Sequence, residues 1–245
     1  MPFFYYDGII DPTAKICLKG SETRHIRLVR KIRPNEKIEL QDTTYNRYDC
    51  VVTLVKNSYI ECDIVQKINP PPEPKENIHL ALAIPKEKAL DTILQKSVEL
   101  GAHALHLFES DFSQRLPKGE SRMSKYSRWT KILQESCKQC NRLKPPELHL
   151  VDKLDELCTN FNSDTTDIWL LHPGDVRTSP EKLEKRWENT ILIVGPEGGF
   201  SDKDLDVLPK NYLSLGPRLL RSDTAAITAL SLFQFYRGDM NLPVV

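Results

Sequence analysis

A proline-rich segment is the feature that most constrains how this chain of 245 residues can fold. Residues 70–74 hold four prolines, in the run Pro-Pro-Pro-Glu-Pro. Proline has no backbone N–H and fixes φ, so the run excludes a helix interior or a central strand and favours an extended, stiff connector. We therefore expect two domains, residues 1–69 and residues 78–245, joined by a linker at residues 70–77.

The segment before the linker has the pattern of short β-strands. Residues 37–42, 48–54 and 59–64 alternate apolar and polar side chains, as half-buried strands do. Turn-forming residues at 33–35 and 56–58 separate these stretches. Short strands spaced so closely predict a compact β-barrel.

After the linker, strand and helix patterns alternate. Apolar strand candidates lie at residues 78–84, 104–108, 167–171, 191–194 and 212–215. The first helix between them follows Pro85 and ends at Gly101. Its apolar face consists of Leu90, Ile93, Leu94 and Val98. This alternation predicts an α/β domain with a mostly parallel sheet covered by helices, in which ligands bind beyond the carboxyl ends of the strands.

Composition and charge exclude several classes of protein. Hydrophobic residues make up 40% and charged residues 28%, which is ordinary for a folded domain and excludes a disordered chain. No apolar run approaches the roughly 20 residues that cross a bilayer. The first residues also lack the pattern of a signal peptide. We therefore expect a cytoplasmic protein with no membrane partner.

The six cysteines are scattered along the chain, which is typical of reduced thiols in a cytosolic protein. Cys137 and Cys140 form a C-x-x-C pair, which is compatible with a redox pair or with half of a metal site. No second C-x-x-C or H-x-H pair accompanies it, and it lies within a long helical pattern. We interpret both cysteines as structural thiols and expect no metal.

Glycine-rich turns follow two of the predicted strands. The first, Gly-Pro-Glu-Gly-Gly-Phe at residues 195–200, leads into a helix that Ser201 caps, with Asp204 as its capping-box partner. Glycines let backbone N–H groups approach a ligand, and a helix N-terminus adds positive potential. The turn matches neither the P-loop nor the dinucleotide-binding pattern. From spacing alone it is either a ligand-binding loop or a tight turn that needs positive φ.

The second turn starts at Gly216, where the strand at residues 212–215 ends. An apolar segment follows, and a helix begins near Asp223. The apolar side of that helix consists of Ile227, Leu230 and Phe233. Arg221 and Asp223 are either a helix cap with a surface ion pair or functional polar groups beside the turn.

Together the two turns carry a family resemblance. Gly-Pro-Glu-Gly-Gly-Phe, followed about fifteen residues later by Leu-Gly-x-x-Leu-Leu-Arg-x-Asp-Thr-Ala, resembles the signature of the RsmE-type rRNA methyltransferases of the SPOUT superfamily. Three further elements match: Arg-His-Ile-Arg-Leu-Val-Arg at residues 24–30, Lys-Ser-Val-Glu-Leu-Gly at 96–101, and Glu-Ser-Cys-Lys-Gln-Cys-Asn-Arg at 135–142, with Pro-Pro at 145–146. The resemblance covers nearly the whole chain.

The chain departs from the family pattern at four places. Val29 replaces a leucine, Asn35 and Glu36 replace Gly-Asp, and residues 222–224 read Ser-Asp-Thr instead of Thr-Glu-Thr. These changes are conservative. At Phe112 the family's Ser-Glu-Arg-Ser has an arginine, so this chain lacks a side chain for which the resemblance implies an RNA or active-site contact.

The resemblance implies a PUA-like β-barrel that binds RNA, followed by a SPOUT domain with a trefoil knot that also forms a homodimer. The family uses S-adenosylmethionine to methylate N3 of a uridine in 16S rRNA of the small ribosomal subunit. The knot loops correspond to residues 171–174, 195–199 and 215–225. The implied cofactor-binding residues are Leu171, His172, Gly195, Pro196, Glu197, Gly198, Gly199, Leu215, Gly216, Leu219, Leu220, Thr224 and Ala225.

The chemistry of that reaction suggests three catalytic residues. Uridine N3 is a poor nucleophile while it carries its proton, so the enzyme must favour the deprotonated base. We predict that Arg221 stabilises the negative charge on the uracil carbonyls, and that Asp223 or Glu197 accepts the proton or orients the arginine. The target base must also leave its stack to reach a pocket.

Two basic stretches agree with an RNA partner. Residues 24–33 hold five arginines or lysines and no acid, and residues 115–144 hold nine against two acids. Each stretch alone is more often a solvated helix face, but with the family signature they predict a phosphate-binding face. The candidate RNA-binding residues are Arg24, His25, Arg30, Arg115, Arg122, Arg128, Gln139 and Arg142.

Two other interpretations remain. The first is an RNA-binding ribosome-assembly factor whose methyltransferase pocket is vestigial; the retained Glu197, Gly198, Gly199, Arg221 and Asp223 argue against it. The second is a phosphate-binding hydrolase that uses the turn at residues 195–199. The sequence offers no nucleophile–base pair or metal cluster near that turn.

Overall fold

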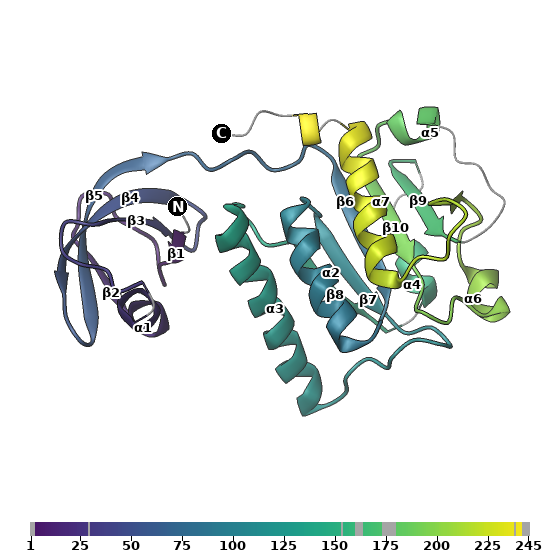
Figure 1. The fold of residues 1–245 in the computed structure, drawn as a ribbon, viewed down its shortest axis with the longest axis horizontal. Coiled ribbons are helices and arrows are strands. Elements are labelled where there is room, and N and C mark those ends of the chain that lie inside the picture. The colour runs from purple at the N-terminus through teal and green to yellow at the C-terminus, as the bar shows by residue number, and fades with distance from the viewer. Residues whose placement is uncertain are drawn as a thin grey trace. The chain divides into compact units, whose positions relative to one another are not determined.

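The chain divides into two units in a computed structural model that describes residues 3–28, 30–152, 154–159, 164–172, 180–237 and 239–241 (Figure 1). One unit comprises Met1–Pro72 with Cys137–Lys144, and the other Glu73–Ser136 with Pro145–Val245. The division falls inside the proline-rich segment. Residues 137–144 group with the first unit, although the sequence placed them in the second domain.

The first unit is built on a five-stranded mixed sheet with one helix, α1 (Ser21–Leu28). In their order across the sheet the strands are β1 (Phe3–Tyr5), β3 (Lys37–Gln41), β4 (Arg47–Val55), β5 (Tyr59–Ile68) and β2 (Ile16–Lys19). β1 runs parallel to β3, and the other neighbours are antiparallel. The three strands predicted from the alternating pattern are confirmed. β1 and β2 are too short for that pattern to show, and neither they nor α1 were predicted.

The sheet curls around its core, but it does not close within the described residues, where β1 and β2 form its two edges (Figure 1). The expected barrel is therefore an open, curled sheet. Register irregularities in β4, between Asp49 and Cys50 and between Val52 and Leu54, bend that strand. The turn before β3 holds Asn35 at φ +70°, which explains how asparagine can replace the family's glycine, because asparagine tolerates this region.

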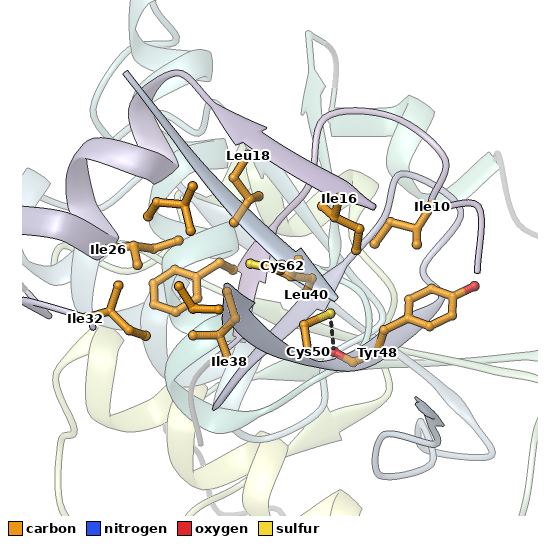
Figure 2. Close-up of a cluster of buried hydrophobic side chains, with 13 residues drawn as sticks. Ile10, Ile16, Leu18, Ile26, Ile32, Ile38, Leu40, Tyr48, Cys50 and Cys62 are labelled. Atoms are coloured by element: carbon orange, nitrogen blue, oxygen red, sulfur yellow. Dashed lines mark hydrogen bonds between the residues drawn. The ribbon is translucent and has the colours of Figure 1, made fainter. Parts of the chain in front are cut away.

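The core of the first unit fills the concave side of this sheet (Figure 2). Alternate residues of β3, β4 and β5 contribute to it, with apolar residues from the preceding loops and α1. Its members are Phe4, Ile10, Ile16, Leu18, Ile26, Ile32, Ile38, Leu40, Tyr48, Cys50, Val52, Ile60 and Cys62. Burial raises the pKa of Cys50 and of Cys62 to about 12, so both thiols stay protonated and inert at neutral pH.

A buried arginine ties residues 137–144 to this sheet. The side chain of Arg47 is 1% exposed, and its guanidinium lies over the Phe3 ring, 3.9 Å from the ring centre. It donates to the Oε1 of Gln41 at 2.7 Å, to the carbonyl of Arg142 at 3.1 Å and to the side chain of Asn141. Burial lowers the pKa of Arg47. Because a buried donor without a partner is costly, this network fixes the segment to the first unit.

The second unit contains a six-stranded sheet in which every neighbouring pair runs parallel. The strands, in their order across the sheet, are β11 (Tyr212–Leu213), β9 (Thr166–Leu171), β10 (Asn189–Val194), β6 (Asn77–Ala83), β7 (Ala104–Phe108) and β8 (Glu147–Val151). The helices are α2 (Glu87–Glu99), α3 (Glu120–Cys140), α4 (Leu154–Thr159), α5 (Pro180–Glu184), α6 (Asp202–Val207) and α7 (Ser222–Arg237), with a 3-10 turn at Asp239–Asn241.

Helices pack on both faces of this sheet. On one face α7 packs against α2, β6 and β10 (Figure 1). Phe233 of α7 contacts the ring of Trp169. On the other face, residues of α4 and α6 join a core that includes Ala81, Leu170 and Ile193. The predicted mostly parallel α/β sheet is confirmed. In the described residues no helix is long and apolar enough to cross a membrane.

Local predictions in the second unit differ from the structure in three places. The helix after Pro85 begins at Glu87, buries its predicted apolar face and ends at Glu99, two residues before Gly101, whose φ is +75°. β8 was not predicted, because Glu147 and His149 interrupt its three apolar residues, Leu148, Leu150 and Val151. β11 ends at Leu213, two residues earlier than expected. Cys137 and Cys140 lie in α3 and form no disulfide among the described residues, and the side chain of Cys158 lies outside those residues.

Candidate functional site

A cavity lies at the carboxyl ends of three neighbouring strands of the second unit. β9, β10 and β11 are adjacent in the parallel sheet, so their ends, at Leu171, Val194 and Leu213, meet at one edge. The cavity has a volume of about 190 Å³. Its lining comes from both glycine turns and from the start of α7: Leu171, His172, Val194, Gly195, Pro196, Glu197, Gly199, Phe200, Leu213, Leu215, Gly216, Arg218, Leu219, Leu220, Ser222 and Ala225.

The first glycine turn, residues 195–201, is firmly held. The N–H of Gly199 donates to the carbonyl of Pro196 at 2.9 Å, which closes the turn. The capping box predicted for α6 is confirmed, because Ser201 Oγ accepts from the N–H of Asp204 and the Asp204 carboxylate accepts from the N–H of Ser201. Ser201 Oγ also donates to Asp111 Oδ2 at 2.7 Å. The turn is therefore attached to its own helix and to the loop after β7.

The glycines of this turn are required for different reasons. Gly199 has φ +75°, and a Cβ there would meet no atom within 4 Å, so conformation and not space excludes other residues. A Cβ on Gly195 would lie 2.9 Å from the ring of Phe200, which closes the turn over it. A Cβ on Gly198 would lie 3.1 Å from the Cβ of Phe112. Of these three glycines, only Gly199 is required because the turn needs positive φ, and the other two are required because a neighbouring side chain lies close.

The second glycine turn, residues 214–221, has few internal restraints. Gly216 has φ +104° with open space at its Cβ position, and Leu219 is 82% exposed. Among the described residues, residues 214–220 form no hydrogen bond. Arg221 is 76% exposed, and its Nε lies 3.8 Å from Asp223 Oδ1, which is a loose ion pair. Asp223 Oδ1 accepts from the N–H of Thr224 at 2.8 Å.

Most residues predicted to bind the cofactor line this one cavity. The exceptions are Gly198, which contacts Phe112 outside it, and Thr224, which is exposed on α7. Of the three predicted catalytic residues, Glu197 lines the cavity, whereas Arg221 and Asp223 are not among its lining residues. Residues 173 and 174 of the first predicted knot loop lie outside the described residues.

Sequence reasoning missed five lining residues: Val194, Phe200, Leu213, Arg218 and Ser222. Val194 ends a predicted strand and Leu213 lies within another, so their place near the sheet edge was a usable signal. Arg218 brings an exposed guanidinium to the cavity, which its place in an apolar-looking segment obscured. Ser222 differs from the others because its hydroxyl is buried.

Ser222 supplies the polar contact that a ligand would need. Its side chain is 5% exposed, and its Oγ has no hydrogen-bond partner among the described residues. Buried hydroxyls are usually paired, and this one lies in the wall of the cavity, where a bound ligand can be its hydrogen-bond partner. Leucines around it give apolar surface suited to an adenine ring, and the glycine turns expose backbone groups. The residues present therefore fit S-adenosylmethionine.

The predicted RNA-binding residues of the first unit remain available to an external partner. Arg24, Arg30, Lys31 and Arg33 are exposed, and none has an ion pair with an acid within the described part of the chain. The side chain of His25 lies outside the described residues, as does Val29. Gln139 is exposed near the end of α3, and Arg142 contributes its carbonyl to the Arg47 network.

The predicted RNA-binding residues of the second unit are mostly paired with acids. Arg115 pairs with Glu109 at 2.9 Å, Arg122 with Asp152 at 2.8 Å, and Arg128 with both Asp91 and Glu87. The acids lie outside the basic stretch in sequence, so its charge excess could not reveal them. Most of the positive charge that sequence counting assigned to these arginines is therefore locally balanced.

A second group of titratable side chains lies near the amino ends of the strands. His79 Nδ1 lies 3.1 Å from His106 Nε2, and the His106 ring stacks on His149. Burial lowers the pKa of His79 to about 4 and of His106 to about 3, so both are neutral at physiological pH. No group of three or more metal-ligating side chains is present in the described ranges.

Comparisons with known proteins point to one activity. Residues 71–234 match the family model of the RNA methyltransferase domain. The chain is 29% identical to the ribosomal RNA small subunit methyltransferase E of Buchnera aphidicola subsp. Schizaphis graminum, with 98% of each chain covered. It also resembles a Legionella pneumophila methyltransferase solved with S-adenosylmethionine, at 30% identity and a TM-score of 0.85, covering 96% of this chain and 97% of that one.

A second solved structure agrees. The ribosomal RNA small subunit methyltransferase E of Neisseria gonorrhoeae, bound to S-adenosylmethionine, is 25% identical with a TM-score of 0.84. The alignment covers 96% of this chain and 97% of that one. Both units of the present chain are thus represented in proteins that bind this cofactor.

Proposed function

Because the chain belongs to the RNA methyltransferase family, we propose that it uses S-adenosylmethionine to methylate N3 of a uridine in 16S rRNA of the small ribosomal subunit. The observation that carries the proposal is the cavity at the carboxyl ends of β9, β10 and β11, which joins both glycine turns to the buried, unpaired hydroxyl of Ser222. The solved relatives named above bind the same cofactor. The uridine and its N3 position follow from the RsmE-type resemblance.

Different residues of the cavity offer different contacts to the cofactor. Leu171, Leu213 and Leu215 offer apolar walls, and the turn at residues 195–199 offers backbone N–H groups. Ser222 Oγ offers a hydrogen bond that nothing else in the described residues uses. When bound, S-adenosylmethionine supplies a methyl group made electrophilic by its positively charged sulfur.

The polar residues at the cavity serve the uracil. Its N3 must lose a proton, so a carboxylate has to accept that proton while a cation stabilises the negative charge on the ring carbonyls. Arg221 is our candidate cation, and Arg218, which lines the cavity, is the second arginine within the same turn. We propose that Glu197, which lines the cavity, or Asp223, which lies beside Arg221, accepts the proton.

The first unit is proposed to hold the flanking RNA through α1 and the loop after it. Its cations Arg24 and Arg30 are exposed and without ion pairs to described acids, which leaves them available to phosphates. By resemblance, the protein is further proposed to be cytoplasmic, to carry the trefoil knot in its C-terminal region and to act as a homodimer.

A methyl-transfer assay tests the proposed activity. Full-length protein is incubated with methyl-labelled S-adenosylmethionine and small ribosomal subunits from cells that lack this gene. We expect one labelled methyl group per subunit, recovered as 3-methyluridine in nucleoside mass spectrometry. Subunits from cells that carry the gene should accept almost none. RNA binding without transfer would instead support an assembly factor with a vestigial pocket.

A salt titration tests the RNA-binding face. Reversing both charges, as Arg24→Glu with Arg30→Glu, should weaken binding to the subunits and lower the slope of log affinity against log salt by about 1 to 2, since each lost phosphate contact releases about 0.7 to 0.9 fewer counterions. The matched control reverses the exposed Lys37 and Lys67 of the same unit. An unchanged slope in the arginine variant would assign α1 to an ordinary solvated face.

A further inference from the structure

Phe112 is an exposed aromatic side chain on a rigid turn. It lies in the connection between β7 and α3 (Figure 1), and its side chain is 59% exposed. The resemblance places an arginine at this position, so the chain has exchanged a charged residue for an apolar one without burying it. A single exposed apolar residue is ordinary by itself. Phe112 differs because its turn is held by hydrogen bonds and because it lies beside the cavity.

The turn that carries Phe112 is fixed on both sides. Ser113 Oγ accepts from the N–H of Ser110 at 2.8 Å, and the N–H of Gln114 donates to the carbonyl of Ile84 at 2.9 Å. Asp111 binds the capped end of α6, with its carboxylate accepting from Ser201 and its N–H donating to Asp204 at 3.3 Å. The backbone before and after Phe112 is therefore held in place, and the ring is presented to solvent.

The ring is presented beside the candidate cofactor cavity. A Cβ on Gly198 would lie 3.1 Å from the Cβ of Phe112 and 3.6 Å from its Cγ, so the side chain rests directly against the first glycine turn. The two neighbours of Gly198, Glu197 and Gly199, both line the cavity. Phe112 thus stands beside the turn that contains Glu197, the carboxylate proposed for the chemistry.

We propose that Phe112 is a stacking platform for an unstacked base of the substrate RNA, either the target uridine or its neighbour. This inference rests on the proposed function, because it requires RNA at the cavity. Single-stranded bases stack on aromatic rings and on arginine guanidinium planes alike. A phenylalanine therefore keeps the flat stacking surface of the expected arginine and gives up only its charge. The contact positions the base before reaction and takes no part in proton transfer.

Steady-state kinetics on four variants tests this inference, with the small subunits from gene-deleted cells as substrate. Phe112→Ala should raise KM for the subunits by about 5- to 100-fold, the range that loss of one stacked base produces. The value of kcat and the calorimetric affinity for S-adenosylmethionine should stay within about threefold, because the ring contacts neither reacting group. Phe112→Tyr and Phe112→Trp should restore KM, while Phe112→Leu should resemble Phe112→Ala.

Phe235 provides the control for this experiment. Phe235, with an exposed fraction of 54% on α7, matches Phe112 in residue type and exposure, and Phe235→Ala should leave KM unchanged. Full rescue by leucine would indicate an apolar contact with a ribosomal protein and would overturn the stacking role. A normal KM in Phe112→Ala, with an active wild-type enzyme, would overturn this inference alone. An inactive wild-type enzyme would overturn the proposed function as well.

Discussion

The two glycine turns that border the cavity differ in how firmly the rest of the fold holds them. Residues 195–201 are closed by a backbone hydrogen bond, capped onto α6 and bound to Asp111 of a separate loop. Residues 214–220 form no hydrogen bond among the described residues, and they expose Leu219 almost fully. Both turns contain a glycine with positive φ, so the difference lies in their attachments.

The difference suggests a division of roles between the turns. A rigid turn with exposed backbone groups is suited to bind a ligand of fixed shape, because no ordering cost arises on binding. A turn with few attachments is suited to close around a large substrate after it arrives. We therefore assign the first turn mainly to the cofactor, and the second, with Arg218 and Arg221, mainly to the RNA base and its chemistry.

The largest expected effect falls on the second turn. Arg221→Lys should lower the single-turnover rate of methyl transfer by about a hundredfold to a thousandfold, because lysine cannot offer two parallel donors to a developing negative charge. Affinity for S-adenosylmethionine should stay within about threefold, as calorimetry can show. Arg186→Lys, at another exposed arginine of the second unit, is the control. A wild-type rate in Arg221→Lys would make Arg221 only an ion-pair partner of Asp223.

The next effect falls on the first turn. Gly199→Val forces a β-branched residue to φ +75°, a strain of about 1 to 3 kcal/mol that the free protein relieves by moving the turn away from its binding conformation, so that cofactor binding must restore the strain. Affinity for S-adenosylmethionine should fall by about 5- to 150-fold. Gly119→Val is the matched control, because Gly119 also has positive φ and open space at its Cβ but lies away from the cavity. Equal affinity in wild type and Gly199→Val would reduce the turn to a structural connection.

A direct comparison of the turns predicts a smaller effect at Gly216. Gly216→Val meets a similar conformational obstacle at φ +104°, but the surrounding turn has few attachments and can adjust. Its loss of cofactor affinity should be less than that of Gly199→Val in the same calorimetric titration. If Gly216→Val proves the more damaging, the second turn is the rigid half of the site and the assignment of roles is reversed.

The smallest expected effect tests the buried hydroxyl. Ser222→Ala removes one hydrogen bond to the cofactor, worth about 1 kcal/mol, so affinity should fall about fivefold. Ser231→Ala, on the same helix, is the control because its hydroxyl already donates to the carbonyl of Ile227 at 2.8 Å. A Ser222→Ala variant with unchanged affinity would mean that another group satisfies this hydroxyl.

The sequence was informative where a signal is local. The strands and helices with clear periodicity, the capping box at Ser201 and Asp204, and the glycine at positive φ follow from short-range patterns, and all are present. The family signature also identified eleven of the sixteen residues that line one cavity. Parallel strand order could then bring the two turns together, since both follow strands that end at the same edge.

Contacts between residues far apart in the sequence could not be predicted from short-range patterns. The partners of Arg122 and Arg128 lie far from them in sequence, so counting charges overestimated the positive character of the second basic stretch. The Arg47 network was missed for the same reason, because nothing marks one arginine among many as buried. Ser222 was overlooked beside Thr224 because helical phase, which decides which hydroxyl faces the cavity, changes within two residues.

A crystal structure of the full-length chain with S-adenosylmethionine tests the central claim most directly. We expect ligand density between residues 195–199 and residues 215–225, with backbone groups of the first turn and Ser222 Oγ within hydrogen-bond distance of its polar atoms. Arg221 should not contact the ligand's carboxylate. Density elsewhere on the chain, or a ligand in the cavity that leaves Ser222 Oγ without a partner, would contradict the assignment of this cavity and its two turns.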